Sequence, residues 1–180
     1  MARPFDPRRF YEEVLKANGI VAAFGVPDSS LSGLLSYFSA TKPLSEHIVT
    51  ANEGGAVALA AGYYLSTRKV ALAYMQNSGL ANALNPLQSL AAKEVFGLPM
   101  LLMIGWRGKP GEKDEPQHAL IGPRIPDNLR ANDFPYEEIP DTLSGAKEAV
   151  ARLVAKSMQD NTPVALIVPT KTFLDYPLTR

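Results

Sequence analysis

Residues 51–64 read Ala-Asn-Glu-Gly-Gly-Ala-Val-Ala-Leu-Ala-Ala-Gly-Tyr-Tyr, and the interpretation of the whole chain is built outward from them. They follow the apolar run 47–50, which is typical of a buried strand. The small residues after Glu53 predict a helix that can approach another backbone closely, as a tight contact between subunits or domains requires. Glu53 itself stands where strand gives way to helix. A carboxylate there is stabilised by the helix N-terminus, so Glu53 is either a complement to the helix dipole or a functional acid.

The composition is that of an ordinary globular domain. The chain has 180 residues, enough for a full core, and residues 1–180 are interpreted as one domain. Eighteen basic and eighteen acidic residues cancel, which indicates neither nucleic acid nor a membrane surface as partner. The sequence has no cysteine, which excludes disulfides and thiolate catalysis. No run has the length of a signal-peptide core or a membrane span, so a soluble, cytoplasmic protein is expected.

Apolar runs alternate with helical patterns along the chain. Buried strands are expected at 20–25, 47–50, 70–75, 98–104 and 164–168, and a shorter edge strand at 136–139. Helices are expected at about 7–18 and 31–38, through the small residues after Glu53, and at about 79–90 and 141–158. This alternation predicts an α/β fold, a doubly wound and mostly parallel sheet with helices on both faces. Ligands of such sheets bind beyond the carboxyl ends of the strands.

Two turns at that end of the sheet carry polar side chains. The turn 25–30 places Asp28 and Ser29 at a helix N-terminus, where they suit either an anionic ligand or a plain helix cap. The segment 76–86 gathers four amides around one turn, together with Ser78 and with Gly79, which permits close backbone approach. Buried amides need partners. Those partners are either a ligand or neighbouring backbone, and the amides are Gln76, Asn77, Asn82 and Asn85.

The segment 105–124 is expected to be a long irregular loop, and such loops inside compact domains are usually functional or disordered. Its Arg107, Lys113 and His118 suit a small dianion, although loop charges are commonly just solvated. Phosphate-loop, dinucleotide-turn and serine-nucleophile motifs are all absent from the sequence. Because His47 and His118 are far apart in sequence, no metal site is expected on this chain.

Four motifs together resemble the phosphonopyruvate decarboxylases, which use thiamine diphosphate. They are Gly25-Val26-Pro27-Asp28-Ser29, Ala51-Asn52-Glu53-Gly54, Tyr74-Met75-Gln76-Asn77-Ser78-Gly79-Leu80, and the long segment from Gly105-Trp106-Arg107-Gly108 to Lys113-Asp114-Glu115-Pro116-Gln117-His118. The resemblance implies the pyrimidine-binding fold of that enzyme class. Sulfopyruvate decarboxylases are similar around residues 75–80 but differ at 105–106 and 114–116, so they are the second choice.

The resemblance also implies roles for single residues. Glu53 is expected to hydrogen-bond the aminopyrimidine ring of thiamine diphosphate and so to activate the cofactor. Asp28 is similar in position to an aspartate that assists proton transfer, although the family places it one residue later. The expected cofactor-binding residues are Glu53, Gln76, Asn77, Ser78, Gly79 and Asn82. The expected substrate-binding residues are Ser29, Arg107, Lys113 and His118.

The sequence departs from the family in one respect. The phosphonopyruvate decarboxylases that this sequence resembles commonly carry a second half, which holds the diphosphate and Mg²⁺ through a Gly-Asp-Gly motif. This sequence has no Gly-Asp-Gly. We therefore expect an α subunit that shares its cofactor with a β subunit in a hetero-oligomer, α2β2 or larger, and that decarboxylates a small anionic 2-oxo acid. The alternatives are a sulfopyruvate decarboxylase α subunit and a non-catalytic scaffold or regulatory subunit.

Overall fold

The computed structural model describes residues 4–177, and its centre is a six-stranded sheet with the order β2-β1-β3-β4-β6-β5. Every neighbouring pair of strands is parallel, which confirms the predicted doubly wound α/β sheet. The strands are β1 (Ala23–Gly25), β2 (His47–Val49), β3 (Leu72–Gln76), β4 (Met100–Trp106), β5 (Tyr136–Glu138) and β6 (Pro163–Pro169).

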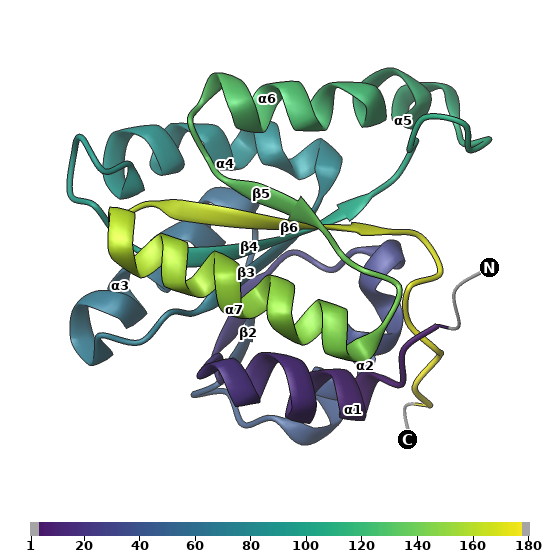
Figure 1. The fold of residues 1–180 in the computed structure, drawn as a ribbon, viewed down its shortest axis with the longest axis horizontal. Helices are drawn as coiled ribbons and strands as arrows, with labels where there is room; N and C mark the ends of the chain where they lie inside the picture. The colour runs from purple at the N-terminus through teal and green to yellow at the C-terminus, as the bar shows by residue number, and fades with distance from the viewer. Residues whose placement is uncertain (1–3, 178–180) are drawn as a thin grey trace.

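Helices cover both faces of the sheet (Figure 1). One face carries α1 (Pro7–Phe10) with its continuation η1 (Tyr11–Leu15) and η2 (Lys16–Asn18), and also α2 (Ser32–Thr41) and α7 (Leu143–Asp160). The other carries α3 (Glu53–Thr67), α4 (Leu80–Pro86) with its continuation η5 (Leu87–Ala91), and α6 (Ile125–Ala131). Short helical turns η3 (Ser29–Leu31), η4 (Asn77–Gly79) and η6 (Gly122–Arg124) and helix α5 (Pro116–Ile121) complete the elements.

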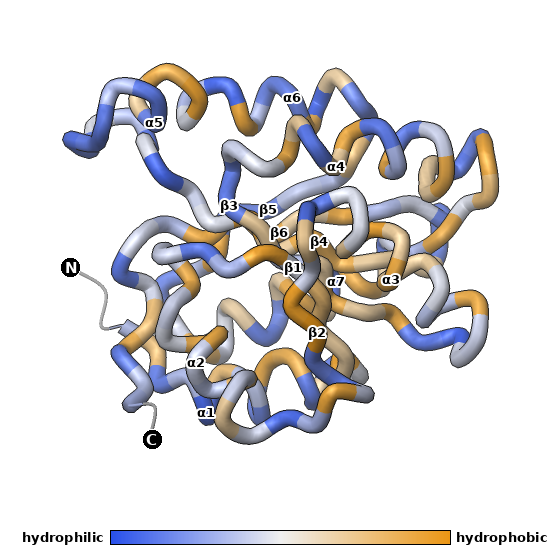
Figure 2. Tube along the Cα trace, turned by 180° about the vertical axis from the view of Figure 1, so that it is seen from behind, coloured by the Kyte–Doolittle hydropathy of each residue, from blue (hydrophilic) through white to orange (hydrophobic). Residues whose placement is uncertain are grey.

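Each central strand is apolar on both sides because its side chains pack against the helices on both faces of the sheet. Alternate residues of β3 and β4 pack into different clusters: Leu72 and Leu101 lie with α1, α2 and α7, and Ala73 and Leu102 with α3, α4 and α6. Figure 2 shows these strands as the hydrophobic centre of the chain. None of the helices in the described residues is long and apolar enough to cross a membrane.

Two expectations from the sequence are wrong. The run 47–50 was expected to be a buried strand, but β2 lies at the edge of the sheet and pairs only with β1, which leaves Val49 55% exposed. The segment 105–124 was expected to be an irregular loop, but it contains α5 and η6, and α6 follows without a break. Pro116 and Pro126 stand in the first turn of α5 and α6, where proline starts a helix rather than interrupting it.

Candidate functional site

Glu53 is the first residue of α3, and its carboxylate lies against the turn that follows β3. Asn52 caps the helix by accepting a hydrogen bond from the backbone N–H of Gly55 at 2.8 Å. Glu53 is only 9% exposed, and its Oε2 accepts a hydrogen bond from Asn82 Nδ2 at 3.0 Å. A Cβ at Gly79 would stand 2.2 Å from Glu53 Oε1. The missing side chain at position 79 is therefore what lets the carboxylate rest on this turn.

Asp28, at the end of β1, is a second buried acid at this end of the sheet. Its Oδ1 accepts hydrogen bonds from Gln76 Nε2 at 3.0 Å and from the backbone N–H of Ser30 at 3.2 Å. Its Oδ2 is buried without a partner among the described residues and lies against Gly105, whose Cβ would stand 1.7 Å away. Ser78 in turn donates to Gln76 Oε1 at 2.8 Å. A polar chain thus runs from Asp28 toward the turn on which Glu53 rests.

Asn77 uses both ends of its amide on the backbone of Arg107. Its Nδ2 donates to the Arg107 carbonyl at 2.8 Å, and its Oδ1 accepts from the Arg107 N–H at 3.3 Å. The side chain is 99% buried. The sequence left open whether the buried amides bind a ligand or neighbouring backbone, and Asn77 binds backbone. Its two hydrogen bonds connect the end of β3 to the end of β4.

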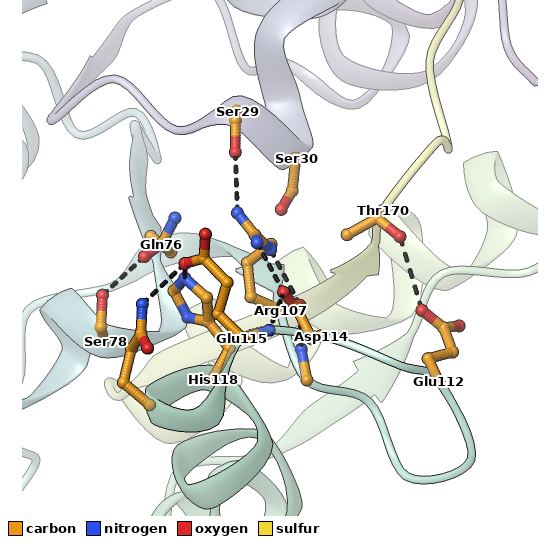
Figure 3. A network of polar contacts seen from close by, with 12 residues as sticks. Ser29, Ser30, Gln76, Ser78, Arg107, Glu112, Asp114, Glu115, His118 and Thr170 are labelled. Carbon is orange, nitrogen blue, oxygen red and sulfur yellow. Dashed lines mark hydrogen bonds and ion pairs between the residues drawn. The ribbon is translucent and has the colours of Figure 1, made fainter.

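The cations of segment 105–124 differ in their burial and in their partners, and Figure 3 shows Arg107 between Ser29 and Asp114. Arg107 is held by Asp114 through two hydrogen bonds and donates a third, at 3.3 Å, to Ser29 Oγ. The Arg107 guanidinium holds the pKa of the Asp114 carboxyl well below its usual range. His118 is buried on α5, where its Nδ1 has no partner among the described residues. Lys113 is exposed.

A cavity of about 800 Å³ opens beside Arg107 at the carboxyl ends of β4 and β6. Lys113, Ser29 and Ser30 face it, but neither Glu53 nor His118 lines it, so the expected cofactor residues and the cavity are neighbouring regions rather than one pocket. Asp114 and Lys171 also line it and were missed in the sequence. The rule that ligands bind beyond strand ends would have indicated the turn 170–172 after β6, since it follows a strand as turns 26–30 and 76–79 do.

The second histidine, His47, lines a smaller cavity of about 330 Å³ together with Tyr74, Asp28 and Ser29. His47 Nε2 and the hydroxyl of Tyr74 are hydrogen-bonded at 2.9 Å inside the sheet. Burial lowers the pKa of His47, and the nearby Lys42 charge acts in the same direction. Within residues 4–177 there is also no group of three His, Cys, Asp or Glu side chains that could hold a metal ion.

The profile described as "Thiamine pyrophosphate enzyme, N-terminal TPP binding domain" matches residues 9–127, which is more than half of the chain. The chain belongs to the thiamine pyrophosphate enzymes. Within this family it is 36% identical over 160 residues to the phosphonopyruvate decarboxylase of Streptomyces viridochromogenes, a match that covers 89% of this chain and 39% of that protein. It is 32% identical over 160 residues to the sulfopyruvate decarboxylase subunit alpha of Methanococcus maripaludis, covering 87% of this chain and 92% of that one.

Solved structures agree on the fold of this thiamine pyrophosphate enzyme. Benzoylformate decarboxylase from Polynucleobacter necessarius superposes with a TM-score of 0.72 at 20% identity, over 97% of this chain and 32% of that chain. At this identity the likeness establishes the fold alone. The chain spans about two fifths of the phosphonopyruvate decarboxylases that it matches, 39% in both cases, and nearly the whole of the Methanococcus maripaludis subunit alpha.

We expect the buried carboxyl of Asp28 to make the stability of the fold depend on pH. Burial raises the pKa of its carboxyl, and the hydrogen bond from Gln76, those from Ser30 and the Arg107 charge only partly oppose this. The native state therefore binds the proton more tightly than the unfolded chain, so ionised Asp28 destabilises the fold as pH rises through its native pKa. Asp28→Asn keeps an oxygen for both donors. We expect it to be more stable than the parent at pH 7 by about 1 kcal/mol.

That advantage should disappear below the unfolded pKa of 3.8, where Asp28 is protonated in both states. Urea unfolding at a series of pH values measures it, with Asp175→Asn as the control for loss of an exposed carboxylate. A difference between Asp28→Asn and the parent that does not change with pH would contradict this assignment.

Proposed function

We propose that the chain is the α subunit of a thiamine-diphosphate-dependent 2-oxo-acid decarboxylase and that it binds the aminopyrimidine side of the cofactor. The observation that carries the proposal is the buried carboxylate of Glu53. It is fixed by Asn82 on one oxygen and cradled by Gly79 at the other, and no described side chain donates to that second oxygen. A buried acceptor of this kind suits an N–H donor of a ligand ring.

The preferred reaction is the conversion of 3-phosphonopyruvate to phosphonoacetaldehyde and carbon dioxide. The 36% identity to a phosphonopyruvate decarboxylase supports this substrate. Sulfopyruvate is the second candidate, supported by the near full-length match to a sulfopyruvate decarboxylase subunit alpha. Both substrates are 2-oxo acids with an anionic group at the far end, so the same cavity chemistry serves either one.

The protein's own contribution is to hold and move protons at fixed positions. When bound, thiamine diphosphate supplies the electron sink for the carbanion left by loss of carbon dioxide. Glu53 would accept the hydrogen bond of the pyrimidine ring N–H, with its carboxylate oriented by Asn82 and Gly79. Asp28, whose pKa is raised by burial, would exchange a proton with the reacting carbon; Gln76 orients its carboxyl, and Ser78 holds Gln76. The Asn77 contact to Arg107 fixes the wall on the substrate side.

The remaining parts of the site are assigned to a partner chain. The sequence has no Gly-Asp-Gly motif, so we place the diphosphate and its Mg²⁺ on a β subunit in a hetero-oligomer. Relatives named as subunit alpha support such a division. Exposed residues of α3 offer it an apolar surface of two small residues and two leucines, namely Ala58, Gly62, Leu59 and Leu65.

Calorimetric titration of thiamine diphosphate with Mg²⁺ tests the proposal, first on this chain alone and then on its mixture with a candidate β subunit that carries the Gly-Asp-Gly motif. We expect no measurable binding by the chain alone and binding by the mixture, followed by release of carbon dioxide from 3-phosphonopyruvate. Binding by neither sample would leave the scaffold alternative. Faster turnover of sulfopyruvate than of 3-phosphonopyruvate by the mixture would assign the second substrate.

A further inference from the structure

The turn after β6 holds a lysine in an unusual backbone conformation. Lys171 has a φ angle of +62°, in the left-handed region that a side chain disfavours. The other described non-glycine residues with positive φ are Arg68 and Asn161, which are the C-caps of α3 and α7, and Asp133, which directly follows the last turn of α6. Helix ends adopt this conformation routinely. Lys171 has no such reason, because it follows a strand.

The conformation of Lys171 is fixed from several sides. Thr172 Oγ1 donates to the Pro169 carbonyl at 2.7 Å, and the Thr172 carbonyl accepts from the Phe5 N–H, also at 2.7 Å. On the preceding residue, Thr170 Oγ1 donates to Glu112 Oε2 at 3.4 Å (Figure 3). Strained residues held in this way are concentrated at ligand sites. Lys171 lines the 800 Å³ cavity, so the turn adds an ammonium group to its wall.

Charges around the cavity are unevenly paired. Arg107 and Lys109 line it but are bound to Asp114 and Glu138. Lys113 and Lys171 have no ion pair within residues 4–177. Two acids of the wall, Glu112 and Asp141, likewise have none, and Glu112 is engaged by Thr170. The cavity therefore offers two free ammonium groups on the loops that follow β4 and β6.

Hydroxyl donors face the same cavity from the turn after β1. Ser30 is 95% buried, lines the cavity, and its Oγ has no partner among the described residues. Ser29 Oγ accepts a hydrogen bond from Arg107 and so keeps its own proton free to donate. Figure 3 shows both side chains on the side facing Arg107 and Thr170. A buried hydroxyl without a partner calls for a ligand, and donors together with free ammonium groups select an oxyanion.

We propose that Lys171, Lys113 and Ser30 bind the anionic head group of the substrate, a phosphonate or sulfonate carried on a short organic acid. Lys171 is then a specificity-determining residue, while Arg107 is held by Asp114 as part of the wall. The inference rests on the proposed function and adds to it the group that the cavity recognises and the turn that recognises it.

Binding of 3-phosphonopropionate, an unreactive analogue with the same head group, tests this on the full chain without any cofactor. At low salt we expect calorimetry to detect binding by the parent, and Lys171→Gln to raise the Kd at least about tenfold. Lys69→Gln is the matched control, because Lys69 is exposed before the start of β3, at the opposite end of the sheet, and should leave the Kd within about twofold. Propionate, which lacks the head group, should bind neither protein.

Lys171→Gly separates recognition from a structural role. Glycine adopts the left-handed conformation without strain, so this variant should unfold at a temperature no lower than the parent while losing the analogue as Lys171→Gln does. The inference is wrong if the parent does not bind 3-phosphonopropionate or if Lys171→Gln binds it as tightly. The two proposals can fail separately. If the chain binds the analogue but its mixture with the β subunit neither binds thiamine diphosphate nor decarboxylates, the proposed function is wrong and this anion site stands.

Discussion

Glu53→Gln should abolish decarboxylation by the assembled enzyme, with a loss of at least about 100-fold in kcat, the scale of a missing proton-transfer group. Glutamine has the same size and can still accept the hydrogen bond from Asn82. It cannot provide a charged acceptor for the ring N–H of the cofactor. We therefore expect the fold and the association with the β subunit to be retained while activity is lost, as measured by release of carbon dioxide and by circular dichroism.

Glu94→Gln is a suitable control for this experiment. Glu94 is exposed on the segment before β4, and its carboxylate lies 3.6 Å from the ammonium group of Lys93, so its substitution should leave kcat unchanged. Activity of Glu53→Gln within a few-fold of the parent would rule out the assigned role and return Glu53 to the structural alternative, a complement to the dipole of α3.

Gly79→Ala should displace the carboxylate of Glu53 by steric contact. The new Cβ would stand 2.2 Å from Glu53 Oε1, and a contact under 3 Å forces the carboxylate away from its position. Overpacking of this kind costs about 1–3 kcal/mol in the free energy of unfolding. We expect urea unfolding to show that loss, and the displaced carboxylate to lower kcat by roughly tenfold to 100-fold, since misplaced catalytic groups lose about that much.

Gly62→Ala provides the matched comparison. Gly62 lies on the exposed side of α3, and a Cβ there meets nothing within 4 Å. Alanine at a helix interior is favoured over glycine by about 0.5–1 kcal/mol, so this variant should gain stability when the chain alone is unfolded in urea. If Gly79→Ala behaved like Gly62→Ala, the close contact with Glu53 would not be important.

The sequence was sufficient for the parallel sheet because β3, β4 and β6 serve two helical layers and are apolar throughout. It was insufficient for β2, since a three-residue apolar strand has the same composition at the edge of a sheet as in its centre. Helix α5 was missed because the whole segment 105–124 was interpreted as a loop, although Pro116 begins a helix, and no element was predicted at α6.

The candidate site shows a similar division. The contacts of Glu53 with Asn82 and Gly79 join two turns whose position follows from strand order, so the sequence could bring them to one end of the sheet. The pairing of Arg107 with Asp114 depends on the path of the loop between them, which no periodicity encodes.

The bridge between Phe5 and Phe173 has a consequence for how quickly the chain folds. The Phe5 N–H donates to Thr172 and the Leu174 N–H donates to the Phe5 carbonyl, so residues from opposite ends of the described chain meet beside the β6 turn. A parallel sheet already requires long crossovers, and contacts of this sequence separation must overcome the largest loop-closure entropy. We therefore expect slow folding in which the turn that carries Lys171 is completed last, after β6 has joined the sheet.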